Sequence, residues 1–371
     1  MLFTIAILAL IALLFGVSSR PAKPLAGVLA DVRGLITPAN LAFWFTKLDT
    51  QLGYTYSITP TFAEAIASTI PSSTEQNGYA WIGRLDKMRL WQGSRVTHEP
   101  APQTYFLINQ PFELTEKIDR FKLDDDQMGV YERTMPEMAI QAKKWPDYQM
   151  RDLIENLGAQ TGTRQNGLDG LTYFNSAHPI DLYNAAAGTY SNDFTGGGSN
   201  VTYANGKTIL TGGAFGPTAV STLYSYMLQL KAENGEPLGV MPNEILVPTS
   251  LATEAELVLK STFYAPPQWN TIGAGTGGNA TQVGTADNPI RRFGLDFRII
   301  PELTDVVKWY LADTKKAFKP FLWQMRQAPV LAARVQETDP NVFDTHTYLF
   351  GYWSRGAPGW GFSWLCCRSS S

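Results

Sequence analysis

YAWIGRLDKMRLWQGSRV, residues 79–96, contains an alternating pattern that predicts an unusually long β-hairpin, the feature that most narrows the possible folds. Apolar and polar side chains alternate around Trp81 and Trp91, and the alternation returns in YFLI at 105–108. This pattern predicts a long two-stranded hairpin over residues 79–118. Because a strand of about 15 residues is roughly 50 Å long at ~3.3 Å per residue, the tip cannot fold back onto its own core. We therefore expect an arm that lies on another surface; a sheet pair inside an ordinary core is the alternative.

The hairpin carries more positive than negative charge. Asp86 is the only acidic neighbour of a group of basic side chains. Such an arm can meet acidic patches on a partner, or it can be a solvated face, and both interpretations stay open. The candidate contact residues of the hairpin are Trp81, Arg84, Lys87, Arg89, Trp91 and Arg95.

A second pattern follows the hairpin and predicts a helix that runs to about Leu157. The run Asp124-Asp125-Asp126 favours a helix start, because carboxylates stabilise the positive end of the helix dipole. Successive helical residues point to different sides, so this triple carboxylate is not predicted to bind a metal ion. Pro146 explains one phase slip in the apolar stripe, because it removes an intrahelical hydrogen bond. The stripe consists of Met138, Ala142, Trp145, Met150, Leu153, Ile154 and Leu157.

The second half of the chain alternates loops with short regular elements. Residues 186–216 and 262–289 are rich in Gly, Thr, Asn and Ser and are predicted to be surface loops. Between them, residues 245–248 are predicted to form a buried strand, and residues 251–260 a helix. Aromatic residues alternate with glycines over residues 348–365, as expected for late β-strands.

The first 17 residues, MLFTIAILALIALLFGV, form an uninterrupted apolar run. Its length lies at the lower limit for a membrane span and the upper limit for the core of a signal peptide, yet no basic residue precedes it. We expect residues 1–34 to be a removable leader or an extension outside the functional fold. A membrane-anchored or secreted protein is the alternative.

A helix is predicted after this extension. Thr37 is its N-cap, and Pro38 occupies the first helical position. The apolar side chains that recur there at helical spacing are Leu41, Trp44, Phe45 and Leu48.

The glycines, histidines and serine that could form a nucleotide-binding, metal or catalytic site do not occur in the spacing that such sites require. The spacing G-x-G-x-x-G occurs at 273–278, but inside a Gly/Thr/Asn-rich run and not between a strand and a helix. His98, His178 and His346 lack metal-ligand spacing, and a polar structural contact is expected of His178. Ser176 lies two residues from His178 with no sign of an oxyanion hole. The sequence thus predicts no catalytic residue, no cofactor and no metal site.

Composition narrows the function further. The 371-residue chain has a net charge of −3 and no block of Lys or Arg, so it lacks the clustered basic face of a protein that grips phosphates. Charged residues make up only 17% and aromatic residues 12%, which suits burial against neighbours and also a large core. Cys366 and Cys367 are adjacent and rarely bridge each other, which fits a reducing compartment. A disulfide between chains stays open.

Seven segments, in order along the chain, carry a family resemblance. They are LITPANLAFWFTKLDTQL (35–52), YAWIGRLDKMRLWQGSRV (79–96), LTEKIDRFKLDDDQMGVYERTMPEM (114–138), LDGLTYFNSAHPI (168–180), NEILVPTSLATEAELVLKS (243–261), WYLADTKKAFKPFLWQMRQAP (309–329) and YLFGYWSRGAPGWGFSWL (348–365). Together they resemble the major head (capsid) subunit family of Mu-like tailed phages, the gpT type. The resemblance covers roughly nine tenths of the chain.

The resemblance implies an α+β fold, the tailed-phage major capsid fold of the Hong Kong ninety-seven type. It also implies the parts of that fold. These are an N-terminal arm at 35–78, an extended E-loop hairpin at 79–118, a peripheral domain with the spine helix at 119–180, an axial domain at 181–308 and return strands at 309–371.

The same resemblance implies a structural shell subunit and not an enzyme. Pentamers and hexamers of such a subunit would close into an icosahedral head around double-stranded DNA, with scaffold or protease and portal proteins as partners. The N-arm contacts would come from Leu41, Trp44, Phe45 and Leu48. We expect no membrane association, assembly in the bacterial host cytoplasm and a final place in the virion. An encapsulin-like nanocompartment shell is the alternative.

Overall fold

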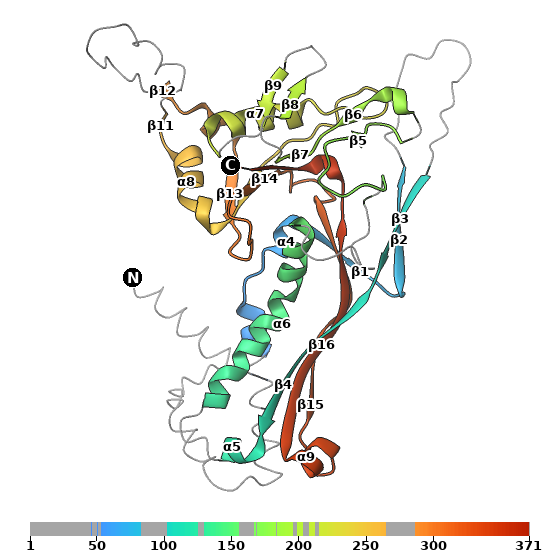
Figure 1. Cartoon of the computed structure of the whole chain (residues 1–371), viewed down its shortest axis with the longest axis vertical. Helices are drawn as coiled ribbons and strands as arrows, with labels where there is room; N and C mark the ends of the chain where they lie inside the picture. Colours follow the sequence, from blue (N-terminus) through green and yellow to red (C-terminus); the bar gives the residue numbers. More distant parts are fainter. Residues whose placement is uncertain are drawn as a thin grey trace, which may run out of the picture.

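The structure is a computed structural model that describes most of the chain from residue 53 to residue 370 (Figure 1). Residues 1–34 and the predicted arm residues Leu41, Trp44, Phe45 and Leu48 lie outside the described residues. The residues described are 46, 50, 53–82, 102–124, 130–155, 167, 169–182, 184–195, 199–202, 208–211, 215–264 and 286–370.

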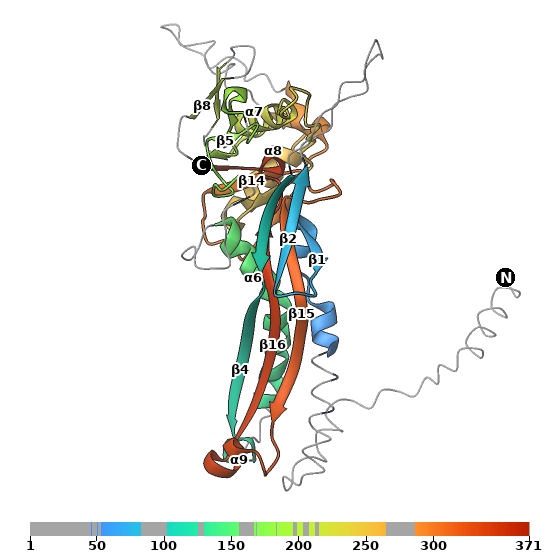
Figure 2. The same cartoon turned by 90° about the vertical axis from the view of Figure 1, so that its right-hand side faces the viewer.

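Two sheets lie one after the other along the long axis of the molecule (Figure 1). The longer sheet has the strand order β1 (Ala67–Pro71), β15 (Phe321–Arg334), β16 (Thr347–Trp360) and β4 (Gln110–Asp119). β1 runs parallel to β15, and the other neighbours are antiparallel. β15 and β16 have 14 residues each, and they give the lower half of the molecule its elongated form (Figures 1 and 2).

The predicted helix is α6 (Val130–Ile154), and it covers one face of the long sheet. Met138, Ala139 and Ala142 of α6 pack against aromatic residues of β16, among them Tyr348 and Phe350. The stripe residues from Met138 to Ile154 are buried as predicted, while Leu157 lies outside the described residues. The helix continues through Pro136 and Pro146, and burial of its apolar stripe from Met138 to Ile154 offsets the lost backbone hydrogen bonds.

The second sheet has five short strands. Their order is β13 (Asp296–Ile299), β10 (Glu244–Val247), β14 (Lys308–Ala312), β17 (Cys366–Ser370) and β7 (Asp193–Phe194). Ile245, Leu246 and Val247 of β10 are buried, as the apolar run at 245–248 predicts, and the strand begins one residue earlier, at the buried Glu244. Two helices, α7 (Pro217–Leu228) and α8 (Ala252–Lys260), contribute their apolar faces to the same core.

A shared core joins the two sheets where β16 ends and β17 begins. The ring of Tyr173 stacks on Trp360 with centroids 4.8 Å apart. The Tyr173 hydroxyl lies 3.2 Å from the carbonyl oxygen of Pro320 and 3.1 Å from that of Phe362. Because those carbonyls flank the start of β15 and the end of β16, one fully buried tyrosine fixes both ends of the junction.

The predicted hairpin is present with different limits. β2 (Gln76–Ile82) pairs antiparallel with β3 (Pro102–Ile108), from Gln76 opposite Ile108 to Ile82 opposite Pro102. Residues 110–118, which the sequence assigned to the hairpin, belong instead to β4 and pair with β16. The alternation is equally good in either pairing, so periodicity could not distinguish the partners. Residues 83–101 lie outside the described residues.

The remaining elements are short. One helix, α9 (Pro340–Thr345), connects β15 to β16 at the far end of the long sheet, next to α5 (Arg120–Asp124) (Figure 1). The others are α4 (Ala63–Ile66), α5 (Arg120–Asp124), β5 (His178–Pro179), β6 (Thr189–Tyr190), β8 (Ser199–Thr202), β9 (Thr208–Thr211), β11 (Phe263–Tyr264), β12 (Ala286–Asp287) and the 3-10 turns Ala185–Ala187, Thr249–Leu251, Pro289–Phe293 and Ser363–Leu365.

Helices and sheets mix as the predicted α+β class requires, and that prediction is confirmed. Within the described ranges, none of the helices combines the length and apolar character that a bilayer crossing needs. The apolar run at residues 1–17 is not among the described residues.

Candidate functional site

The long sheet has an inner face that packs on α6 and an outer face turned away from it. Cross-strand partners in antiparallel sheets share a face. The outer face is therefore defined by three rows, each running from β15 through β16 to β4. The rows are Val330–Trp353–Glu113, Ala332–Gly351–Thr115 and Arg334–Leu349–Lys117. Figure 2 shows this part of the sheet in front of α6, with no other described element in front of it.

Apolar side chains on the outer face are left in solvent. Trp353 is 44% exposed and Val330 is 38% exposed, although they are direct neighbours across β15 and β16. On the inner face, Tyr348, Phe350 and Tyr352 are buried. Aromatic residues that remain exposed next to other apolar groups are typical of protein–protein contact sites.

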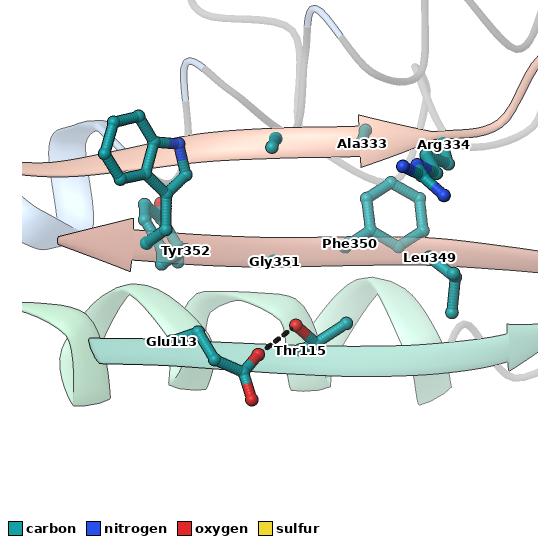
Figure 3. A pocket seen from close by; sticks show the side chains of 10 residues that line it. Glu113, Thr115, Ala333, Arg334, Leu349, Phe350, Gly351 and Tyr352 are labelled. Carbon is teal, nitrogen blue, oxygen red and sulfur yellow. Dashed lines mark hydrogen bonds between the residues drawn. The ribbon is translucent and has the colours of Figure 1, made fainter. Parts of the chain in front are cut away.

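A shallow groove of about 270 Å³ crosses the outer face (Figure 3). Gly351 and Ala332 form its floor because they have little or no side chain. A Cβ atom at Gly351 would lie 2.9 Å from the Thr115 hydroxyl oxygen, so only glycine leaves this depression without displacing Thr115. The groove is also lined by Glu113, Arg334, Leu349 and Trp353 of the outer face, and by Ala333, Phe350 and Tyr352, which lie between outer-face residues along β15 and β16.

The two ends of the groove differ in charge. The Thr115 hydroxyl donates a hydrogen bond to the Glu113 carboxylate, which orients that carboxylate beside Trp353 (Figure 3). Arg334 lines the other end, in the same row as Lys117. The groove can thus accept an aromatic or aliphatic segment with a cation near Glu113.

The base of the hairpin is fixed to the junction between the sheets. The Tyr79 hydroxyl donates to Gln324 Oε1 at 2.7 Å, and Gln324 Nε2 donates to Asn109 Oδ1 at 2.8 Å. A Cβ atom at Gly359 would lie 2.7 Å from Leu107, so β3 approaches β16 as closely as a glycine allows. Tyr105 and Leu107 of β3 are also buried in the core at this junction. Beyond it, the described parts of the two strands run away from the long sheet (Figure 1).

The predicted hairpin contacts are only partly described. The backbone of Trp81 lies in β2 opposite Gln103. Arg84, Lys87, Arg89, Trp91 and Arg95 lie outside the described residues, so these contacts stay predictions. The outer-face residues were missed. The alternation of Tyr348, Phe350 and Tyr352 against Trp353 was a usable signal, because it places Trp353 on the opposite face.

His178 makes the polar structural contact expected of it. Its side chain is 1% exposed, Nδ1 contacts the Asp169 carboxylate, and Nε2 lies 2.9 Å from the Tyr173 carbonyl oxygen. Asn192 Nδ2 donates to the same carbonyl at 2.7 Å and to the Ser363 carbonyl at 2.9 Å. Both ring nitrogens therefore serve to hold the loop before β5 to the sheet junction.

The two adjacent cysteines are free and buried in β17. Burial raises the pKa of both Cys366 and Cys367 well above the ordinary thiol value. A protonated thiol that solvent cannot reach is a poor nucleophile, which argues against a disulfide between chains. Among the residues described, no group of three His, Cys, Asp or Glu side chains has the arrangement of a metal site.

Comparison with known proteins identifies similar chains. The family model of the Mu-like prophage major head subunit gpT matches residues 41–204, 214–275 and 302–371. The major capsid protein of Escherichia phage Mu is 23% identical over 329 residues, which is 88% of this chain and 72% of that protein. The Mu-like prophage FluMu major head subunit of Haemophilus influenzae is 21% identical over 298 residues, 80% of this chain and 62% of that protein.

Solved structures of phage heads are also similar. A chain of the bacteriophage JBD30 procapsid is 22% identical, with a TM-score of 0.47, covering 91% of this chain and 76% of that chain. A chain of the bacteriophage JBD30 capsid is 21% identical, with a TM-score of 0.49, covering 73% of this chain and all of that chain (100%).

Proposed function

Because this chain belongs to the Mu-like prophage major head subunit family, we propose that pentamers and hexamers of it close into an icosahedral shell around double-stranded DNA. Members of this family are structural head proteins and not enzymes, and a head subunit belongs to the virion. Assembly in the bacterial host cytoplasm, together with scaffold or protease and portal proteins, is part of the proposal. The relatives give no support to an encapsulin-like compartment.

The observation that carries the proposal is the uncovered outer face of the long sheet. A sheet with one solvated face normally presents polar side chains there. Here Trp353 and Val330 stay exposed in the subunit, beside a groove with a glycine floor. Burying such an aromatic against another chain contributes more than most contacts of an interface.

The proposed occupant of the groove is the hairpin tip of a neighbouring copy, residues 83–101. That tip carries Trp91 and four basic side chains, and the groove offers Trp353 beside the Glu113 carboxylate. An aromatic pair with a nearby cation–carboxylate contact fits both partners. The four basic residues are Arg84, Lys87, Arg89 and Arg95.

The predicted arm at 35–78 ends earlier than expected, because Ala67–Pro71 pairs with β15 and Phe62, Ala63 and Ile66 are buried in the core of their own subunit. The part before α4 is proposed to reach a second neighbour through Leu41, Trp44, Phe45 and Leu48. Small contributions from the arm and the hairpin then sum over every copy in the shell. Interfaces of this obligate kind commonly bury more than ~2,000 Å².

The proposed role toward DNA is that of a wall. The chain has a net charge of −3 and no Lys/Arg block, so it lacks the clustered positive charge that binding to DNA phosphates requires. In this role the shell surrounds the DNA without binding it tightly. In a binding titration near physiological salt, the isolated subunit is expected to show no appreciable affinity for duplex DNA. Tight binding to duplex DNA that weakens with added salt would contradict the proposal that the subunit encloses DNA without binding it.

The test of shell formation replaces Trp81 and Trp91 by Ala in the full-length chain, expressed with its neighbouring genes. We expect a soluble, folded subunit and few or no closed particles in electron micrographs, because aromatic anchors dominate interface energy. The matched control is the Phe double variant, which keeps apolar rings at both positions and should assemble. Normal shells from the Ala variant would exclude the hairpin as a major assembly element.

A further inference from the structure

One buried amide side chain of the long sheet contacts both strands of the hairpin. Gln324 of β15 is 0% exposed, and its Oε1 accepts a hydrogen bond from the Tyr79 hydroxyl of β2 at 2.7 Å. Its Nε2 donates to the Leu107 carbonyl oxygen of β3 at 3.2 Å and to Asn109 Oδ1, just after β3, at 2.8 Å. This residue is therefore bonded to both sides of the hairpin base.

Asn109 extends the network to the turn between β1 and β2. Its side chain is buried, and Nδ2 donates to Ser72 Oγ at 2.8 Å and to the Thr74 carbonyl oxygen at 2.9 Å. The backbone of the same turn is bonded as well. The Ser72 N–H donates to the Met325 carbonyl oxygen, and the Asn109 N–H donates to that of Glu75, each at 2.9 Å. The entry to β2 and the exit from β3 are thus both linked to neighbouring residues of β15.

The two amides of this network have partners for their oxygens and their nitrogens. Burying an amide is costly unless its hydrogen bonds are made, and the neighbours Trp323 and Met325 are apolar. A satisfied buried network favours one arrangement, because any other leaves a donor or acceptor unpaired in an interior of low dielectric constant. The amide at position 324 thus makes the geometry of the hairpin base specific.

Apolar contacts at the same place hold the hairpin without fixing its angle. Tyr105 and Leu107 of β3 are buried in the core at the junction. Apolar burial is non-directional, so it changes little when the hairpin tilts. Hydrogen bonds weaken steeply away from a linear geometry. The polar network is therefore the part of the base that resists a tilt.

The hairpin is held from one of its faces. Tyr79 and Tyr105 are direct cross-strand partners on the face that meets the body. On the opposite face, the Phe106 ring lies against Gly78, where a Cβ atom would be 3.0 Å from Phe106 Cε1. Phe106 is 48% exposed, so solvent and not the body covers it. Without the network, the hairpin could tilt toward this open side.

We propose that Gln324 is a positioning residue that sets the angle at which the β2–β3 hairpin leaves the long sheet, and so the place where the hairpin meets a neighbouring subunit. The second part rests on the proposed function, whereas the angle is a property of the single subunit. Each strand has 7 residues, which is about 23 Å at ~3.3 Å per residue. A tilt of about 10° at the base would move the far end by roughly 4 Å, the length of an apolar contact itself.

The experiment measures the distance between two spin labels on the unassembled full-length subunit by double electron–electron resonance. The labels are attached to Thr104→Cys in β3 and Ala328→Cys in β15, because both residues are exposed. The native Cys366 and Cys367 are buried and should not react with the label. We expect one narrow distance distribution when Gln324 is present.

Gln324→Met keeps an unbranched side chain of similar length and removes the hydrogen bonds to Tyr79, Leu107 and Asn109. The distance distribution should become at least about twofold wider, because only non-directional contacts remain at the base. Tyr79→Phe removes one of these bonds and should widen the distribution less. A distribution as narrow as that of the wild type in either variant would overturn the proposal. If far-UV circular dichroism shows that the Gln324 variant does not fold, Tyr79→Phe decides.

Tyr173→Phe is the matched control. It removes a buried hydroxyl from the same junction, but the partners of this hydroxyl are the carbonyl oxygens of Pro320 and Phe362 and not the hairpin. The variant should unfold at a lower temperature and keep the narrow distribution. A distribution as wide as that of Gln324→Met would also overturn the proposal, since any loosening of the junction would then change the angle. Because the labels report on single subunits, failure of this test would leave shell formation untouched, and failed assembly would leave the hairpin angle untouched.

Discussion

The two faces of the long sheet are made by the same strands and serve different ends. On the inner face, Phe350 and its aromatic neighbours are buried under α6. On the outer face, Trp353 and Val330 remain exposed beside a groove. Because neighbouring residues of one strand point to opposite faces, Phe350 and Trp353 share a backbone and differ only in what covers them. The inner face therefore stabilises the subunit, and the outer face is available to a second chain.

Substitutions on the inner face should lower the free energy of unfolding of the subunit more than any other change proposed here. Phe350→Ala leaves a cavity against Met138 and Ala139, and we expect a loss of about 3–5 kcal/mol in the free energy of unfolding. Chemical denaturation of the soluble subunit measures it. Leu349→Ala, one residue away on the outer face, should cost less than about 1 kcal/mol. Equal losses at both positions would mean that the faces do not differ.

The outer face should show its effect in assembly. Trp353→Ala is expected to change the unfolding free energy by no more than about 0.5 kcal/mol. The same variant should lose about 2 kcal/mol per contact in assembly, which is roughly a thirtyfold weaker contact. Light scattering against subunit concentration reports this loss. A variant that assembles normally but unfolds easily would reverse the assignment of the two faces.

The groove floor gives a smaller, paired prediction. Gly351→Ala brings a Cβ atom to 2.9 Å from the Thr115 hydroxyl and should cost about 1 kcal/mol in unfolding free energy. In a Thr115→Ala background the hydroxyl is gone and only the Leu114 carbonyl oxygen remains tight, at 3.3 Å, so the same substitution should cost clearly less than in the wild type. A double-mutant cycle by thermal unfolding measures the coupling. No coupling would show that Thr115 does not shape the groove.

Removing the negative charge of Glu113 at one end of the groove should have the smallest effect on assembly. Glu113→Gln removes the carboxylate proposed to meet the basic hairpin tip, and it should weaken assembly by about 0.2–1 kcal/mol per contact. The difference from the wild type should shrink at high salt, because salt screens exposed charges. An effect that is independent of salt would assign Glu113 a role through its hydrogen bond with Thr115 only.

Much of the fold was predictable because burial imposes a period on the sequence. The stripe from Met138 to Ile154 predicted α6, and the apolar run at 245–248 predicted β10. The family followed from seven ordered segments, and the match of the family model confirmed it. The groove was not predicted, since Glu113 and Thr115 lie more than 200 residues from Gly351 and share no motif with it.

The chain's own pattern established which side chains lie inward, where α6 and β10 run, and which family the protein belongs to. It left open which strand pairs with which: residues 110–118, predicted to be part of the hairpin, pair with β16 instead. It also gave no sign that Asp147 would reach Phe62 and Ala63. The physical reason is that a period records the two sides of an element, whereas the identity of the neighbour depends on contacts brought together only when the whole chain folds.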